Sequence, residues 1–264
     1  MKKIIAMLLV LTMVLSFAAC AKTEAPATEA PAVEAPATEA PVDTAPAAEE
    51  EGILDGGADI AVDAVLTHEE FMAAELESVV CVETYVQGHQ SWWDNKITVY
   101  CQSEDGAYFL YELQCSEEDA AKLVPGTKIR VTGDKAEWAG EVEIMNGTFE
   151  FVEAEPYIAE ALDVTELLGT DELINHQNEF VSFTGMTVEA IEYKNGEPGD
   201  DIYVTLGYNG ASYDFCVEIY LTGAESEVYT TVGSLNVGDV VNVEGYLYWY
   251  EGVNPHITAI SLAQ

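Results

Sequence analysis

The chain has 264 residues, with 48 acidic against 9 basic side chains and a formal net charge of −39. Hydrophobic residues make up 49% of it and aromatic residues 10%, which argues against a wholly disordered chain, because that much apolar surface favours a packed core. Nucleic-acid affinity depends on Lys and Arg that neutralise phosphates, so the acidic charge leads us to expect no nucleic-acid partner.

The chain begins with a pattern typical of secretion. Two lysines are followed by an apolar run from Ile4 to Phe17 and then by Ala18 and Ala19. This run of about fourteen residues is shorter than the roughly 20 that span a bilayer. The pattern therefore predicts a signal peptide over residues 1–19.

Cys20 directly follows the two alanines. The order Phe17-Ala18-Ala19-Cys20 resembles the lipobox of bacterial lipoproteins, in which leucine usually stands where this chain has phenylalanine. The resemblance implies that Cys20 receives a diacylglyceryl thioether and becomes the mature N-terminus. It therefore implies a protein that is anchored to the cell membrane by lipid and faces outside the cytoplasm.

An acidic linker follows over residues 20–59. Glu-Ala-Pro recurs within it every five residues, at Glu24, Glu29, Glu34 and Glu39. Proline blocks helix and sheet hydrogen bonds, and nothing here is large enough to form a core, so we expect a disordered, extended stalk. At roughly 3 Å per residue it would act as a spacer, and recognition of its proline motif is the alternative.

The remaining residues contain an internal repeat. Glycines spaced by six residues occur at Gly126, Gly133 and Gly140, and again at Gly238, Gly245 and Gly252. Apolar residues alternate before each middle glycine, which predicts a strand with a bend at the glycine. Each last glycine is placed to form a hairpin turn. The repeat predicts two domains, over residues 60–156 and 157–264.

The same periodicity predicts five strands in each copy. In the first they lie near residues 78–87, 96–103, 106–115, 127–138 and 142–153, and in the second near 180–190, 201–208, 212–221, 239–250 and 254–262. Thr67 and Glu70 form a capping-box pattern that predicts a helix before the first copy. Helix-like stretches at residues 164–168 and 171–174 precede the second copy. Residues 116–123 and 222–234 lie between the third and fourth strands, the position at which the family resemblance described next implies a helix.

The order of three strands, a helix and a hairpin resembles the oligonucleotide/oligosaccharide-binding (OB) fold. It is most similar to small bacterial OB modules whose last strands read GD-x-V-x-V-x-G, then Y-x-G, then I, as at Gly238–Gly245, Tyr250–Gly252 and Ile257. The resemblance implies an all-β protein of two tandem five-stranded OB-like barrels, each preceded by a short helix. Some relatives are named for anticodon binding, a role that the charge of this chain disfavours.

OB barrels bind through strands two and three and the adjoining loops. In the first copy the loop 87–95 supplies candidate ligand-binding residues, namely His89, Gln90, Trp92, Trp93 and Asn95. Their aromatic faces can stack on a ligand, and their amides can donate directional hydrogen bonds. Alternatively, one tryptophan caps the open end of the barrel while the other is half exposed.

Two further segments carry weaker candidates. Tyr246, Tyr248 and Tyr250 would share one face of a strand, as a binding platform or as a contact between the two copies. In the second copy, Glu197, Asp200 and Asp201 form a weak calcium candidate, with a solvated turn as the alternative.

No motif for catalysis or for a cofactor is recognisable, and the four histidines are isolated, so we expect no enzyme. Four cysteines fall within predicted strands and are expected as buried thiols, although Cys101 could form a disulfide with a neighbouring strand: Cys81, Cys101, Cys115 and Cys216. Together these features predict a non-catalytic binding module for a carbohydrate, small-molecule or protein ligand. The alternative is a structural or interaction subunit of a cell-envelope complex.

Overall fold

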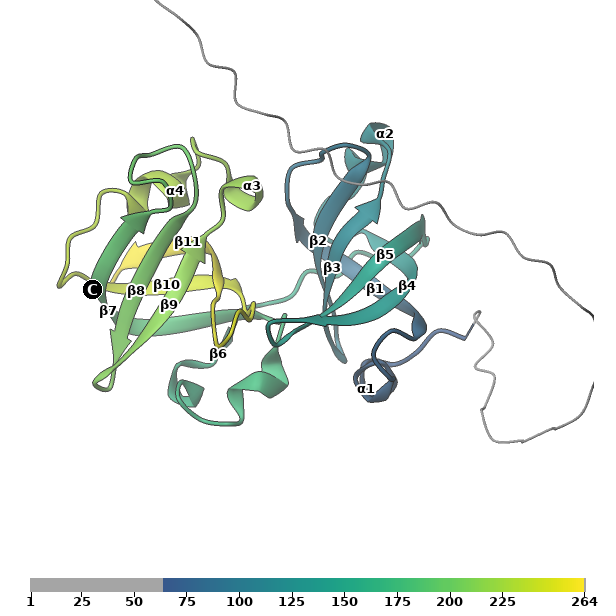
Figure 1. Ribbon diagram of the computed structural model, residues 1–264, viewed down its shortest axis with the longest axis horizontal. Helices are drawn as coiled ribbons and strands as arrows, with labels where there is room; N and C mark the ends of the chain where they lie inside the picture. The colour runs from purple at the N-terminus through teal and green to yellow at the C-terminus, as the bar shows by residue number, and fades with distance from the viewer. Residues whose placement is uncertain (1–63, 264) are drawn as a thin grey trace, which may run out of the picture. The chain divides into compact units, whose positions relative to one another are not determined.

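The computed structural model describes residues 64–263. The predicted signal peptide, Cys20 and the stalk lie outside this range. The described residues fall within one compact unit, and none of their helices is long and apolar enough to cross a membrane. We refer to residues 64–156 as the first half and to residues 157–263 as the second half (Figure 1).

The first half contains a closed five-stranded barrel with the order β1-β2-β3-β5-β4 (Figure 1). Its strands are β1 (Val79–His89), β2 (Lys96–Ser103), β3 (Gly106–Gln114), β4 (Lys128–Trp138) and β5 (Glu141–Phe151). Only β3 and β5 pair in parallel within this barrel. The prediction of a mostly β protein with an OB-like barrel is confirmed, and the strand bounds closely follow the sequence pattern.

The barrel core is filled by the apolar residues that alternate along these strands. Val80, Val82 and Val86 of β1 face inward with Ile129 and Val131 of β4, and all five are buried. Period-two alternation gives each strand one buried face, which is why the sequence pattern located the strands so well.

The second half is built on a six-stranded sheet with the order β10-β11-β9-β8-β7-β6, in which β10 also pairs with β7. Its strands are β6 (Leu162–Asp163), β7 (Phe180–Tyr193), β8 (Ile202–Tyr208), β9 (Ala211–Val217), β10 (Val240–Tyr246) and β11 (His256–Leu262). A single parallel pair, His256 with Cys216, joins β11 to β9. The strand predicted over 239–250 ends at Tyr246, because the chain then turns back and Trp249 pairs with Val253.

Both halves also contain short helices. They are α1 (His68–Ala73), α2 (Glu117–Ala120), α3 (Ile219–Thr222) and α4 (Glu227–Val232), with two 3₁₀ turns, η1 (Thr165–Leu167) and η2 (Leu173–His176). The predicted capping box is present at α1, where Thr67 and Glu70 each accept a hydrogen bond from the other's backbone N–H. In the second half, two 3₁₀ turns precede β7, where the sequence led us to expect a helix.

The middle glycines of the repeat lie where two backbones approach closely. Strand pairing shifts register beside Gly133 and beside Gly245. A Cβ atom on Gly133 would lie 2.7 Å from the Met145 carbonyl oxygen, and one on Gly245 would overlap the His256 carbonyl. The bend predicted from the glycine spacing is therefore a β-bulge in each half.

The four cysteines of the described residues are all free and buried. The expected buried thiols are therefore present, and the disulfide considered for Cys101 is not formed in this structure.

Candidate functional site

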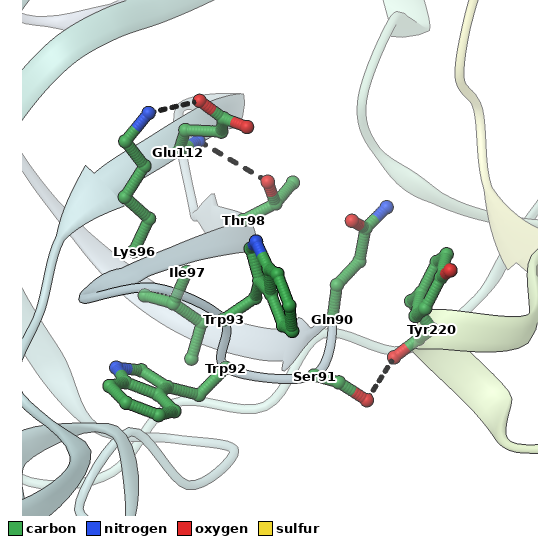
Figure 2. Close-up of a pocket in the computed structure, with 9 residues that line it drawn as sticks. All are labelled: Gln90, Ser91, Trp92, Trp93, Lys96, Ile97, Thr98, Glu112 and Tyr220. Atoms are coloured by element: carbon green, nitrogen blue, oxygen red, sulfur yellow. Dashed lines mark hydrogen bonds and ion pairs between the residues drawn. The ribbon is translucent and has the colours of Figure 1, made fainter.

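A pocket with a volume of about 380 Å³ opens beside the loop between β1 and β2 (Figure 2). Eight of its lining residues belong to the first half and one to α3 of the second: Gln90, Ser91, Trp92, Trp93, Lys96, Ile97, Thr98, Glu112 and Tyr220. Strand β2 forms one wall through Ile97 and Thr98, and the loop forms another. The pocket therefore lies where OB barrels bind their ligands.

The two adjacent tryptophans of this loop have different environments. Trp92 is half-buried against the barrel core, and its Nε1–H donates to the Cys115 carbonyl oxygen at 2.8 Å. The Trp93 side chain is 78% exposed. Figure 2 shows the two rings directed away from each other. Trp92 thus anchors the loop, while Trp93 presents its ring to solvent beside the pocket.

A tight turn holds Trp93 in place. The backbone N–H of Trp93 donates to the Lys96 carbonyl at 3.0 Å, and the N–H of Lys96 donates back at 2.8 Å. The two residues between them, Asp94 and Asn95, have positive φ angles of 46° and 61°. Two successive positive φ angles characterise the type I′ turn, whose twist matches that of paired strands. Asn95 therefore shapes the turn.

The second half closes one side of the pocket. The backbone N–H of Ser91 donates to the Tyr220 carbonyl at 2.7 Å, and the Ser91 hydroxyl donates to the same oxygen at 3.2 Å (Figure 2). The Tyr220 side chain is exposed. The pocket consequently has an aromatic side chain from each half, although sequence reasoning found no signal for Tyr220.

Polar groups complete the pocket. Lys96 Nζ and Glu112 Oε2 form an ion pair at 2.7 Å, and the Glu112 backbone N–H donates to the Thr98 hydroxyl at 3.2 Å. The Gln90 amide donates to the Tyr100 hydroxyl at 3.4 Å. These groups surround Trp93 with donors and acceptors of hydrogen bonds.

The remaining sequence candidates of the first half and of residues 246–250 do not join this pocket. His89 lies at a separate pocket beside Leu221, where its Nδ1 donates to the Gln90 carbonyl. Tyr246 is buried and stacks on Tyr100 with the ring centroids 4.5 Å apart.

The three tyrosines at 246–250 do not form one platform. Tyr248 packs on Phe109 of the first half and on His256. Tyr250 is exposed and forms no ring pair with Tyr246 or Tyr248. Tyr246 and Tyr248 therefore contribute to the contact between the halves, which was the second of the two interpretations of this run.

The weak calcium candidate is arranged around a lysine. Lys194 Nζ lies 2.8 Å from Asp201 and 3.6 Å from Asp200, whereas Glu197 is exposed. The hydrogen bond to Asp201 and the negative charges of both aspartates raise the pKa of Lys194. Within residues 64–263 no group of three or more His, Cys, Asp or Glu side chains is placed to hold a metal ion.

Sequence reasoning missed a group of buried polar residues between the two halves. Glu141 and Glu143, at the start of β5, are almost fully buried, and burial raises the pKa of Glu141 to about 9 and that of Glu143 to about 7. Nearby, the Tyr100 hydroxyl bonds His256 Nδ1 at 2.6 Å, and burial lowers the pKa of His256 to about 4. Groups of the second half contact these residues, since the Trp249 N–H donates to Glu141 and His256 bonds Tyr100.

The six cations of residues 64–263 are already partnered. Lys96, Lys122, Lys128, Arg130 and Lys194 pair with carboxylates. Lys135 donates to the carbonyl oxygens of Met72 and Ala74 at the end of α1. Within this range a phosphate group would therefore compete with an existing partner for every Lys and Arg.

No protein-family model matches the chain, and no curated protein matches it. Among solved structures it is similar to a murine DNA-binding protein bound with double-stranded DNA, at 11% identity and a TM-score of 0.36 over 70% of this chain and 96% of that one. The HINa domain of Ifi202 in complex with 20-base-pair DNA matches at 11% identity and a TM-score of 0.33, over 70% and 98%.

A third similar structure is a deletion mutant of the single-stranded DNA-binding protein from Thermus aquaticus, at 12% identity and a TM-score of 0.24, over 70% of this chain and 94% of that one. The descriptions of these neighbours name DNA-binding proteins, which contradicts the expectation of no nucleic-acid partner and of a ligand limited to a carbohydrate, small molecule or protein. That expectation came from net charge, which averages the whole surface, whereas stacking on aromatic side chains is local.

Proposed function

We propose that the chain binds unpaired nucleobases, which stack on Trp93 at the pocket between β1 and β2. The observation that carries the proposal is the exposed indole of Trp93, held on a rigid turn beside a pocket of about 380 Å³. Stacking of a base on an aromatic side chain stabilises a complex by about 1–3 kcal/mol and tolerates any sequence.

The surroundings of Trp93 suit an uncharged, planar ligand. Tyr220 offers a second aromatic side chain from across the pocket, and Gln90 and Thr98 offer hydrogen bonds to the edge of a base. Lys96 and Glu112, the two charged residues that line the pocket, are paired with each other. These groups support recognition of the base rather than of the phosphate.

The acidic surface leads us to predict how the affinity for a single strand depends on salt concentration. Residues 60–264 carry 38 acidic and 6 basic side chains, which is 6 − 38 = −32. Phosphates are therefore repelled, and added salt screens this repulsion over a Debye length of about 8 Å at physiological ionic strength. We expect affinity for a single strand to rise with salt, the opposite of the usual release of counterions.

A titration with a fluorescently labelled 12-nucleotide single strand tests the proposal, with an abasic strand of equal length as the control ligand. We expect the base-containing strand to bind more tightly, and Trp93→Ala to weaken that binding by about 5- to 150-fold, as the loss of one stacking contact implies. Trp138→Ala removes another exposed indole, at the end of β4, and should leave the affinity unchanged. Equal binding of the two strands by the unaltered protein would reject the proposal.

We further propose that the second half is also an OB-like barrel and that lipid on Cys20 anchors both halves outside the cytoplasm. The repeated glycines and the pairing of β10 with β7 support the first point, and the pattern before Cys20 supports the second. The domain bounds of 60–156 and 157–264 remain predictions. We propose a binding role without catalysis or a cofactor, which agrees with a sequence that has no recognisable catalytic motif.

A further inference from the structure

The hairpin that joins β4 to β5 is held by two segments of the second half. Gln177 Nε2 donates to the Gly140 carbonyl at 2.8 Å, and its Oε1 accepts from the backbone N–H of Val142 at 3.2 Å. From the other segment, the Glu251 backbone N–H donates to the Ala139 carbonyl at 2.7 Å. The residues 139–143 are therefore a principal contact between the halves.

Glu141 lies at the centre of this contact. Its side chain has no exposed surface, and its Oε2 accepts a hydrogen bond from the backbone N–H of Trp249 at 2.8 Å. The second carboxyl oxygen, Oε1, has no partner. Because a buried acceptor without a partner costs free energy, this oxygen requires an explanation.

The Asn178 side chain supplies that explanation. Its Nδ2 donates to the Val142 carbonyl at 3.2 Å, whereas its buried Oδ1 has no partner. Asn178 also lies close enough to the Glu141 carboxyl group to act on it, and this contact lowers the pKa of Glu141, in opposition to the larger effect of burial. A proton on Glu141 would turn Oε1 into a donor, and the unpartnered Asn178 Oδ1 is an acceptor in the same contact, so a single proton is what these two oxygens lack.

No cation is placed to stabilise an ionised Glu141. The carboxyl group that acts on it is Glu143 of the same strand, and Tyr248 faces both carboxyls from the second half. The other acidic and phenolic groups on the elements that pack here are Glu137 on β4, Tyr111 on β3, Tyr250 and Glu251 on the turn after β10, and Glu179 beside Asn178. The basic groups are His176, which bonds Glu179 at 3.0 Å, His68, which lines a pocket with Val142 and Asn178, His256, which stacks on Tyr248, and Lys135 of β4, which donates to the carbonyl oxygens of Met72 and Ala74. None of these basic groups is among those that act on the Glu141 carboxyl group.

We propose that the contact between the two halves requires a protonated Glu141 and is released when this carboxyl group ionises, so that the molecule contains a pH-sensitive interface. An ionised Glu141 would be buried beside Glu143 without a counter-ion, which strongly disfavours the closed contact. The inference concerns the contact itself and holds whatever ligand the Trp93 pocket takes.

The direction of the pH dependence follows from the pKa of Glu141, which burial raises from the ordinary 4.5 to about 9. The closed form binds this proton more tightly than the open form. The closed contact is therefore most stable below pH 4.5 and weakens as the pH rises toward 9. For one linked proton the opening equilibrium increases by up to about tenfold per pH unit.

Hydrogen–deuterium exchange of the full chain at pH 6 and pH 9, corrected for the intrinsic rate, tests the proposal. In the unaltered protein, peptides that contain residues 139–143 and 247–251 should lose protection at pH 9 by at least about tenfold, while the strands of both sheets stay protected. Constant protection of the two contact peptides would overturn the proposal without any substitution.

Two substitutions sharpen the test. Glu141→Gln is isosteric and keeps an N–H donor for Asn178 at every pH, so its contact peptides should stay protected at pH 9. Glu137→Gln removes the same charge from an exposed position on the same hairpin and should behave like the unaltered protein. Loss of protection in Glu141→Gln equal to that in the unaltered protein would show that another group releases the contact.

Discussion

Gly245 has the most restricted backbone environment among the strand glycines of the second half. A Cβ atom here would overlap the His256 carbonyl of the neighbouring strand, which is backbone and cannot rotate away. At Gly207 a Cβ atom would meet only the end of the flexible Glu189 side chain. An added methyl group would therefore have to displace backbone at Gly245 but only a side chain at Gly207.

We expect Gly245→Ala to lower the free energy of unfolding by about 1–3 kcal/mol, the usual cost of overpacking a rigid site. Gly207→Ala should cost less than about 1 kcal/mol, because Glu189 can move. Urea denaturation followed by circular dichroism measures both. Equal losses would mean that the bulge at Gly245 tolerates a side chain and that the repeat spacing has another origin.

At the same scale, the sequence could indicate which loop carries the candidate site but not the role of each residue. Trp92 and Trp93 are chemically identical neighbours, and only the contact with Cys115, distant in sequence, makes Trp92 an anchor. Tyr220 and Glu141 were missed because their environments are created by the other half of the chain. Such contacts leave no local pattern in the sequence.

The first helix shows how a short element is stabilised at both ends. The Thr67 hydroxyl accepts from the Glu70 N–H at its start, and Lys135 Nζ donates to two carbonyl oxygens at its end, each at 2.8 Å. Phe71 packs its ring into the barrel core. A helix of six residues has little stability of its own, so these contacts maintain it.

Thr67→Ala should lower the free energy of unfolding by about 1 kcal/mol, since it removes the acceptor of the capping box. Thr67→Ser keeps the hydroxyl group and should restore most of the loss. Thermal unfolding of the two variants in parallel measures the difference. If the serine variant is as unstable as the alanine variant, the methyl group of Thr67 matters more than its hydrogen bond.

At the element scale, alternation located the strands because each has one buried face. The pattern failed at residues 247–250, where aromatic residues alternate as in a strand. There Leu247 pairs with residues 178 and 179 through backbone hydrogen bonds and the chain turns back. The turn is determined by tertiary contacts, so periodicity alone could not show where β10 ends.

For the whole molecule, the proposed anchor makes a prediction of its own. We expect metabolic labelling with a fatty acid to label the chain when it is expressed in a bacterium, and the label to be lost in Cys20→Ala. Cys81→Ala is the matched control and should keep the label, because Cys81 lies buried in β1. Label in Cys20→Ala, or a chain that fractionates away from membranes with Cys20 intact, would contradict the lipobox interpretation.

The free cysteines have a consequence for where the chain can fold. Burial raises the pKa of the Cys101 and Cys115 thiols, the latter to about 11, which keeps them protonated and slow to react with oxidants. The four described cysteines form no disulfide. Residues 64–263 therefore reach their structure without a thiol oxidase or a disulfide isomerase. They can thus reach this fold in the absence of oxygen as well as in air.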